Sequence, residues 1–422
     1  MSTCSATSTN ACWSWWSWIN LALSSLYFFV DAILIALPSA LTDPLMERYH
    51  IGASGVGLLA AIYFWIYAVL QVPVGVLLAR LGPRCIQIAG LAICSIALWL
   101  ASISSSFAMV CLSRALMGVG ASAGYLVPLV VAGHWFPQRY HAAIIGIILM
   151  VECLGSIWGG LFLAEHQQLG LSSLLQLLAL GCFLLMLICA VYLRDHPEQR
   201  RTAGLTHSSG YHFTVLGNRQ LWKAGAVASL LWLPVAVFAT LWGPSFLQIG
   251  YGLSLPDATR YLAVMWLGIG VGAPLVGLVL AAWKDCGRLL GILSVVGCAA
   301  AIALVYVRGS AGPGLEILLL GVGVACSGQV LAFDAIKSFQ PAALVPASFG
   351  MANTMICMLN AFSQLLSSWL LDVGRIARQA ESRGYNLSDY HLALCLLPVA
   401  FAVAFRLCRK FLVVADYPEI SQ

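Results

Sequence analysis

The chain has 422 residues, of which 61% are hydrophobic and only 9% are charged, and its mean hydropathy is +0.91. A water-soluble domain carries about 25% charged residues, so this composition excludes a soluble globular protein. The formal net charge of +5 comes largely from basic residues in the loops between apolar runs, so it does not indicate a nucleic-acid-binding surface.

Apolar runs of about 20 residues, the length that crosses a bilayer as an α-helix, recur along the whole chain. We expect helices rather than a barrel, because barrel strands would alternate apolar and polar residues and these runs do not. The expected spans, with an error of about 2–4 residues at each boundary, are 18–41, 54–78, 86–104, 107–132, 142–164, 171–193, 223–247, 258–282, 289–307, 314–336, 346–371 and 390–407.

The termini and loops predict how the chain is oriented. Residues 1–17 contain no Lys or Arg, so this stretch does not resemble a cleavable signal peptide. With the N-terminus inside, the inner loops receive 14 of the 21 Lys and Arg residues, the outer loops receive six, and Arg114 stays in the membrane. The positive-inside rule then places both termini in the cytoplasm. The expected segments are a cytoplasmic start at 1–17, a six-helix bundle at 18–193, a polar linker at 194–221, a second bundle at 222–412 and a tail at 413–422.

The stretch 71–84, QVPVGVLLARLGPR, links the second and third spans through a sharp turn with two arginines. It resembles the signature loop Gly-x-Leu-Ala-Asp-Arg-x-Gly-Arg of the major facilitator superfamily. The matching residues are Gly75, Leu77, Arg80, Gly82 and Arg84, whereas Ala79 replaces the aspartate. The resemblance implies twelve helices in two pseudo-symmetric bundles, transport by alternating access, and a conformational latch in this loop that lacks its carboxylate.

Other stretches extend the resemblance along the chain. The segment 134–143 is similar to the family's Trp-Phe-Pro-x-x-Arg turn, and 350–372 is similar to helix 11 of bacterial members. In the fifth span, Gly155-Ser156-x-x-Gly159-Gly160 resembles the Gly-Pro-x-x-Gly-Gly signature of drug and proton antiporters, with Ser156 in place of proline. Spans 1, 7 and 11 are similar to intraphagosomal amino-acid transporters and to siderophore-transporting relatives, which implies an inner-membrane protein of bacteria.

Three charged residues fall at membrane depth, where each costs about 2.5–3.5 kcal/mol on insertion scales. Asp31 and Arg114 are both expected roughly 10–15 Å below the outer surface, from the rise of 1.5 Å per residue. They are candidates for an exchangeable ion pair, or for a static pair that only joins two helices. Glu152 lies near the midplane, where it is either a proton carrier or a permanently protonated carboxylic acid. The motif Arg-x-x-x-Gly-x-Gly at Arg114 resembles a family motif linked to proton coupling.

Milder polar residues recur at helical spacing and predict a substrate cavity. A lone Asn in a membrane helix usually joins two helices, but a stripe of several polar residues is more typical of a surface that meets water or solute. The predicted cavity residues are Asn20, Ser24, Tyr27, Tyr63, Tyr67, Gln71, Tyr125, Trp242, Asn353, Asn360 and Gln364. Trp242 precedes Gly243-Pro244, where a break would permit gating, or it is an anchor at the membrane surface. The glycine-rich stretch 118–124 is expected to be a close-packed part of one helix rather than a phosphate loop.

These observations predict a monomeric, proton-coupled transporter that takes up a small polar or zwitterionic solute, such as an amino acid, short peptide or organic acid. The alternative within transport is a carrier of siderophores or drugs that works by proton antiport. An enzyme or a sensor is disfavoured because neither a catalytic constellation nor an appended soluble domain is evident. No cofactor, metal ion or nucleic acid is expected; the partners are the solute, protons and lipid.

Overall fold

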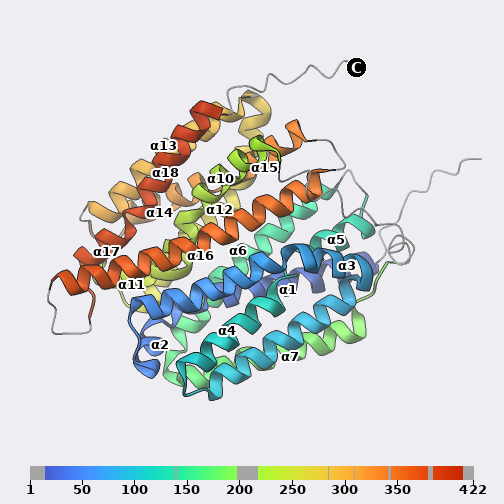
Figure 1. The fold of residues 1–422 in the computed structure, drawn as a ribbon, viewed down its shortest axis with the longest axis horizontal. Helices are drawn as coiled ribbons and strands as arrows, with labels where there is room; N and C mark the ends of the chain where they lie inside the picture. Colours follow the sequence, from blue (N-terminus) through green and yellow to red (C-terminus); the bar gives the residue numbers. More distant parts are fainter. Residues whose placement is uncertain are drawn as a thin grey trace, which may run out of the picture.

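The computed structural model describes residues 15–137, 140–196, 217–283, 285–307, 309–340, 344–378 and 384–411. Within these ranges the chain is helical and contains no strand. Two bundles lie side by side in Figure 1, with α1 to α7 below and α10 to α18 above. The expected start 1–17 is described from residue 15 onward, while most of the linker 194–221 and all of the tail 413–422 lie outside the described residues.

We call the first set of helices the N-bundle. Its helices are α1 (Trp15–Ala40), α2 (Thr42–Tyr49), α3 (Ala53–Ile103), α4 (Phe107–Ala121), α5 (Leu126–Trp135), α6 (His141–Glu165) and α7 (Leu171–Tyr192), with a short 3-10 turn η2 (Gln167–Leu169).

The second set is the C-bundle. It contains α10 (Arg219–Pro234), the π-helical segment η3 (Val235–Trp242), α11 (Gly243–Tyr251), α12 (Leu255–Trp283), α13 (Cys286–Tyr306), α14 (Pro313–Cys326), α15 (Gln329–Phe339), α16 (Val345–Ala377), α17 (Leu387–Leu394) and α18 (Leu396–Phe411).

Eleven helices in the described residues are long and apolar enough to cross a membrane. One of them, α3, has 51 residues, enough for two crossings, and bends at Gly82, whose φ of 81° and ψ of 161° are not helical. Counting α3 twice yields the twelve spans expected from the sequence, and the all-helical membrane fold is confirmed. Most boundaries agree within a few residues, but α16 continues to Ala377, six residues beyond the predicted end, and the short helix α2 was not predicted.

The glycine-rich stretch 118–124 lies inside the helical span Phe107–Trp135, as expected, but the helix is interrupted there. The helix stops at Ala121, and α5 begins at Leu126. Side chains from neighbouring helices engage the carbonyls at this break. The Tyr27 hydroxyl donates to the carbonyl of Gly120, and Gln71 Nε2 donates to the carbonyl of Ser122 at 3.4 Å. The expected close packing is confirmed, because a methyl group at Gly120 would lie only 2.6 Å from Cys94 Sγ.

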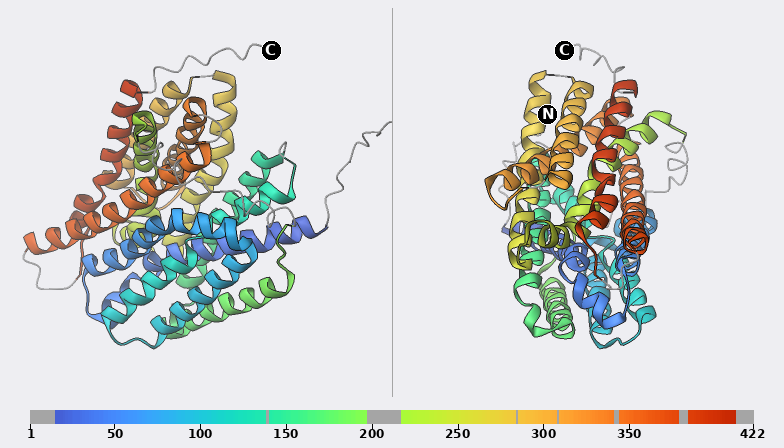
Figure 2. Two further views of the ribbon diagram at one scale, coloured as in Figure 1. Left: turned by 45° about the vertical axis from the view of Figure 1, so that its right-hand side comes forward. Right: turned by 90° about the vertical axis from the view of Figure 1, so that its left-hand side faces the viewer.

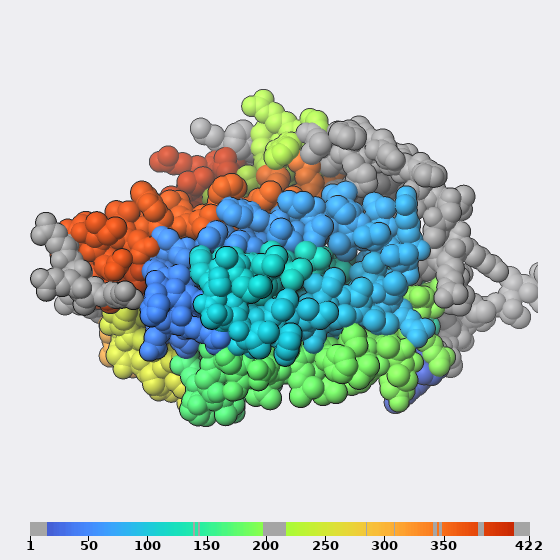
Figure 3. Space-filling view, turned by 60° about the horizontal axis from the view of Figure 1, so that its bottom comes forward, coloured from blue at the N-terminus to red at the C-terminus, as the bar shows by residue number. Residues whose placement is uncertain are grey.

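The two bundles meet at the end of the molecule that carries α2, which we call the α2 end. There α3 and α16 touch so closely that a methyl group at Gly57 would overlap Ser368. Figure 3 shows α16 in orange against α3 in blue along this face. Glu165 and Arg260 form an ion pair of 3.0 Å between the bundles near the same end.

Toward the opposite end, which carries the linker, the same helices separate. Gly75 and Gly350 lie 18 residues, or five helical turns, from Gly57 and Ser368, which places them on the same helix faces about 27 Å away. A methyl group at Gly75 or Gly350 would meet nothing within 4 Å. The left view of Figure 2 shows the ribbons of the two bundles diverging in this direction. The molecule is therefore closed at the α2 end and open at the linker end.

Candidate functional site

Asp31 and Arg114 lie on the same side of the N-bundle, joined through a third residue. The Tyr63 hydroxyl donates a hydrogen bond to Asp31 Oδ1, and the Arg114 guanidinium lies over the Tyr63 ring, 4.5 Å from its centre. No ion pair within 4.0 Å joins Asp31 directly to Arg114, although both residues are described and no more than 4% exposed. Tyr63 thus separates the opposite charges while contacting both. We call Asp31, Tyr63 and Arg114 the charged triad.

Arg114 is held by backbone groups of two other helices. Its Nε donates to the carbonyl of Leu59 at 3.1 Å, and one terminal nitrogen donates to the carbonyl of Leu34 at 2.8 Å. The second terminal nitrogen makes no hydrogen bond with described residues. Because a buried guanidinium is costly unless paired and hydrogen-bonded, these contacts explain how α4 retains a cation inside the membrane.

Glu152 faces this triad from α6. It lies near Asp31, Tyr125 and Tyr67, and its side chain is half-buried. It makes no hydrogen bond or ion pair with any other described residue. A carboxyl group without a fixed partner is free to exchange a proton, whereas a structural carboxylic acid would be bonded to its neighbours.

The C-bundle faces these groups through α16. Cys357 is buried, and both Asp31 and Glu152 lie near its thiol. One turn further, Asn360 is buried and its Oδ1 accepts no hydrogen bond from described residues. The site therefore lies between the bundles, with carboxylates on one side and an unpaired amide oxygen on the other.

Other polar residues predicted on the C-bundle have partners inside that bundle. Gln364 Nε2 donates to the Ala236 carbonyl at 3.2 Å and to Thr240 Oγ1 at 3.1 Å, which ties α16 to the π segment, while its Oε1 has no partner. The Trp242 indole N–H donates to Ser367 at 3.2 Å. Trp242 is 0% exposed, so it does not sit at the membrane surface as an anchor would. Asn353 is half-buried and makes no described hydrogen bond.

The polar stripe of α1 is used mainly inside the N-bundle. Asn20 is fully buried, and its Oδ1 accepts from the backbone N–H of Arg194 at 2.8 Å after α7. Ser24 donates to the carbonyl of Leu21 in its own helix, and Tyr27 holds the break after α4. Gln71, on α3, holds the same break. Of the polar residues in the α1 stripe, only Asp31 belongs to the charged triad.

The signature loop contacts its own bundle. A methyl group at Gly82 would lie 2.7 Å from Asp195, and the backbone N–H of Arg84 donates to Asp195 Oδ1 at 3.0 Å. Position 82 therefore requires glycine both for its positive φ and for this close approach. Arg80 is exposed and makes no described hydrogen bond or ion pair. Asp195, just after α7, is therefore a partner of the signature loop within its own bundle, which the sequence alone did not indicate.

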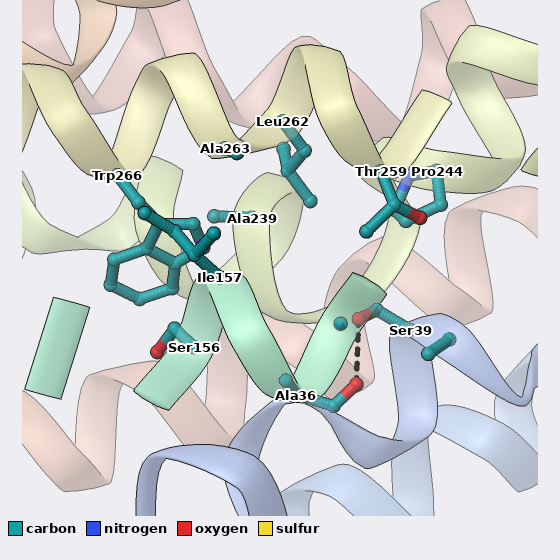
Figure 4. Close-up of a pocket in the computed structure, with 12 residues that line it drawn as sticks. Ala36, Ser39, Ser156, Ile157, Ala239, Pro244, Thr259, Leu262, Ala263 and Trp266 are labelled. Atoms are coloured by element: carbon teal, nitrogen blue, oxygen red, sulfur yellow. Dashed lines mark hydrogen bonds between the residues drawn. The ribbon is translucent and has the colours of Figure 1, made fainter. Parts of the chain in front are cut away.

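A small closed cavity lies between the bundles toward the α2 end (Figure 4). It encloses about 10 Å³, which is room for about one water molecule. Ser156, one turn beyond Glu152, lines it from α6, with Ser39 from α1 and Thr259 from α12 on other walls. In the described residues, no group of three or more His, Cys, Asp or Glu side chains is arranged to hold a metal ion.

Comparison with known proteins agrees with this architecture. The family model described as "Major Facilitator Superfamily" matches residues 20–368. "Uncharacterized transporter YybO" of Bacillus subtilis (strain 168) is 22% identical over 273 residues, covering 59% of this chain and 61% of the relative. "Uncharacterized MFS-type transporter Rv2994" of Mycobacterium tuberculosis (strain ATCC 25618 / H37Rv) is 24% identical over 288 residues, covering 67% of this chain. This match also spans only 61% of the relative's length.

The fold also matches a solved structure over almost its full length. A bacterial homologue of the human lysosomal transporter Spinster, in an inward-facing and occupied conformation, superposes with a TM-score of 0.73. The sequences are 17% identical, and the match covers 94% of this chain and 97% of the other. At this identity, the likeness shows the fold alone.

Proposed function

Because this chain belongs to the Major Facilitator Superfamily, we infer that it is a secondary membrane transporter that works by alternating access, and not an enzyme. We propose that it uses the proton gradient to take up a small polar or zwitterionic solute. Amino acids, short peptides and organic acids are the expected classes. The coupling groups are Asp31 and Glu152, with Arg114 as their counter-charge.

The observation that carries this proposal is the charged triad. Asp31 balances the buried charge of Arg114 through the hydroxyl and ring of Tyr63. When Asp31 takes up a proton, Arg114 loses its counter-charge in a medium where an isolated charge is costly. An anionic group of the solute then restores the balance by binding near the unbonded terminal nitrogen of Arg114. Proton and solute binding thereby become mutually dependent.

Acceptors from both bundles suit the other end of a zwitterion. Glu152 is a half-buried carboxyl group without a fixed partner, and Asn360 presents a buried amide oxygen without a donor. Both are acceptors, as an ammonium group requires. Tyr67 and Tyr125 lie near Glu152, and we assign them to the N-bundle side of the site.

The membrane orientation belongs to the same proposal. With both termini in the cytoplasm of a bacterial cell, the α2 end faces outward and the linker end faces the cytoplasm. The bundles at 18–193 and 222–412 are then the two moving units, and the observed state is inward-facing. A single chain contains both bundles, which supports action as a monomer.

Export by proton antiport, with a siderophore or a drug-like compound as cargo, is the second candidate. It is favoured by the glycines of α6 that resemble the antiporter signature, because they pack closely against α1. A methyl group at Gly155 would lie 2.8 Å from the Phe29 carbonyl, and one at Gly159 would lie 2.9 Å from Ile33.

Transport in proteoliposomes tests the proposal. Amino acids, short peptides, organic acids and iron-chelating carboxylates are supplied in turn, with and without an inward proton gradient. We expect one class to produce a gradient-dependent current. Asp31→Asn should abolish accumulation while exchange of solute without net proton movement continues. Asp43→Asn, which removes an exposed carboxylate from α2, is the matched control and should transport normally.

Full gradient-driven accumulation by Asp31→Asn would remove Asp31 from the mechanism. A current that appears only when the gradient is reversed, or only with bulky compounds, would favour export instead.

A further inference from the structure

The first turn of α3, at the α2 end, is not capped by the side chain of its own N-cap residue. Its N-cap residue is Gly52, which has no side chain to accept a hydrogen bond from the first backbone N–H groups. Such groups must be satisfied by another acceptor or by solvent, and the positive end of the helix dipole favours a carboxylate there.

The missing cap comes from the other bundle. Asp372, near the end of α16, accepts hydrogen bonds from the backbone N–H of Ser54 at 2.9 Å and from its hydroxyl at 2.5 Å. The Tyr385 hydroxyl accepts from the backbone N–H of Ala53 at 2.7 Å and donates to the other oxygen of Asp372 at 2.5 Å. Burial and the bond to Asp372 raise the pKa of Tyr385, so its hydroxyl stays protonated as a donor.

The fit is close enough that a side chain at position 52 would have to displace Asp372 and Tyr385 by a few tenths of an ångström. A methyl group there would lie 3.0 Å from Asp372 Oδ1 and 3.2 Å from the Tyr385 hydroxyl. The cation nearest to Asp372 in its own bundle, Arg375, is 3.9 Å away, at the limit of an ion pair. Apart from Tyr385, the described hydrogen-bond partner of Asp372 is therefore across the interface, at Ser54 of the N-bundle.

The linker end has no matching device in its signature loop. Position 79, where a carboxylate would stand, is alanine, and the loop's described hydrogen bonds go to Asp195 and Ala190 of its own bundle. The hydrogen bonds of Asp372 and Tyr385 to α3 can form only while the bundles touch at the α2 end. Separation there would leave the start of α3 uncapped.

We propose that Asp372 and Tyr385 form a latch that caps α3 across the bundle interface and holds the transporter closed at the α2 end. The latch sets the balance between the two access states, and its residues position helices rather than contact solute. The inference does not depend on the identity of the solute or of the coupling ion.

The test measures the balance of states directly. Spin labels at Glu47 and Ser388, two exposed positions on opposite bundles at the α2 end, report the separation there. The labels are attached to a ketone-bearing unnatural amino acid, because the chain contains 14 cysteines. Distance distributions are recorded in lipid nanodiscs for the full-length protein.

Asp372→Asn should shift the ratio of closed to open molecules toward open by about tenfold, the size expected for loss of a charged helix cap. Ser54→Ala, which removes one hydroxyl bond and keeps the backbone cap, should shift it by about threefold. Asp372→Glu, which keeps a carboxylate at this position, should shift the ratio less than Asp372→Asn does. Ala79→Asp, which returns a carboxylate to the signature loop, should shift the balance in the same direction as Asp372→Asn.

Asp389→Asn is the matched control. Asp389 is also a buried carboxylate that caps a helix, but its described partners, Asn386 and Arg378, are in its own bundle. It should leave the distance distribution unchanged. Unaltered distributions in Asp372→Asn and Ser54→Ala would overturn the latch. If Asp372→Asn does not fold, Ser54→Ala alone decides, and an unchanged distribution there also overturns it.

Discussion

The two bundles share an architecture but differ in what they place at membrane depth. In the N-bundle, Asp31, Arg114 and Glu152 lie seven or more residues from the ends of their helices. In the C-bundle, every charged residue that the structure describes lies within five residues of a helix end; Arg260, Asp334, Asp372 and Arg406 are the deepest. Among the described residues, charge far from a helix end is therefore confined to the N-bundle; the buried Asp389 of the C-bundle lies in the first turn of α17.

The fourth helix of each bundle makes the contrast plain. Both are broken at similar points, between Ala121 and Leu126 in the N-bundle and between Cys326 and Gln329 in the C-bundle. Only the N-bundle helix carries a buried cation before its break. The C-bundle instead has the π-helical segment η3, held to α16 by Gln364. The N-bundle therefore carries the charged groups at membrane depth. The C-bundle carries a π-helical segment, a feature that often marks a functional site.

The largest effect should come from removing the cation of the charged triad. Arg114→Met leaves Asp31 without a counter-charge and removes the bonds to two backbone carbonyls, so we expect a loss of about 3 kcal/mol in the free energy of unfolding. Unfolding in detergent, followed by intrinsic fluorescence, measures this loss. Arg80→Met, which changes an exposed arginine, is the control.

The double variant Arg114→Met with Asp31→Asn should recover part of that loss, because it removes both charges together. Equal destabilisation of the single and double variants would show that the triad is not a charge-balanced unit, and the contrast between the bundles would lose its main support.

An intermediate effect is expected at Glu152. Glu152→Gln removes the proton-accepting group but no described hydrogen bond, so stability should change by less than about 1 kcal/mol. Gradient-driven accumulation in proteoliposomes should fall to the passive leak. Glu316→Gln, which changes an exposed carboxylate on α14 that has no described ion pair, should accumulate solute normally. Normal accumulation by Glu152→Gln would make this residue a structural carboxylic acid.

The smallest effect on stability should be in the C-bundle. Asn360→Leu replaces a buried amide whose oxygen has no described partner, so the free energy of unfolding should change by about 1 kcal/mol or less. Solute affinity, measured by calorimetry, should fall. Gln364→Leu is the contrast, since it breaks two hydrogen bonds to η3 and should destabilise the protein. Destabilisation of Asn360→Leu as large as that of Gln364→Leu would assign Asn360 to packing.

Much of the fold could be predicted from the sequence, because the length of an apolar run is set by the bilayer. The breaks within helices could not. Gly118 to Gly124 suits a close-packed continuous helix as well as a broken one, and the break depends on Tyr27 and Gln71, which are distant in sequence. The π segment is set in the same way by Gln364, far along the chain.

The candidate site could also be predicted only in part from the sequence. Counting residues at 1.5 Å per residue placed Asp31 and Arg114 at one depth, and the structure places them against the same tyrosine. Helical spacing also placed Asn20 and Ser24 on the face of Asp31. It could not show that the side-chain oxygen of Asn20 accepts a hydrogen bond from the backbone N–H of Arg194. Periodicity identifies a common face, but not the neighbour that this face meets.

Gly52 has a consequence for how relatives of this protein should vary. A serine or aspartate at this position would cap α3 from within its own bundle, but its Cβ would lie only 3.0 Å from Asp372 Oδ1 and would crowd that carboxylate. An acidic residue at 372 and a capping residue at 52 are thus alternative ways to accept hydrogen bonds from the backbone N–H groups at the start of α3. In an alignment of relatives they should covary, with glycine at 52 where 372 is acidic and a capping residue at 52 where it is not.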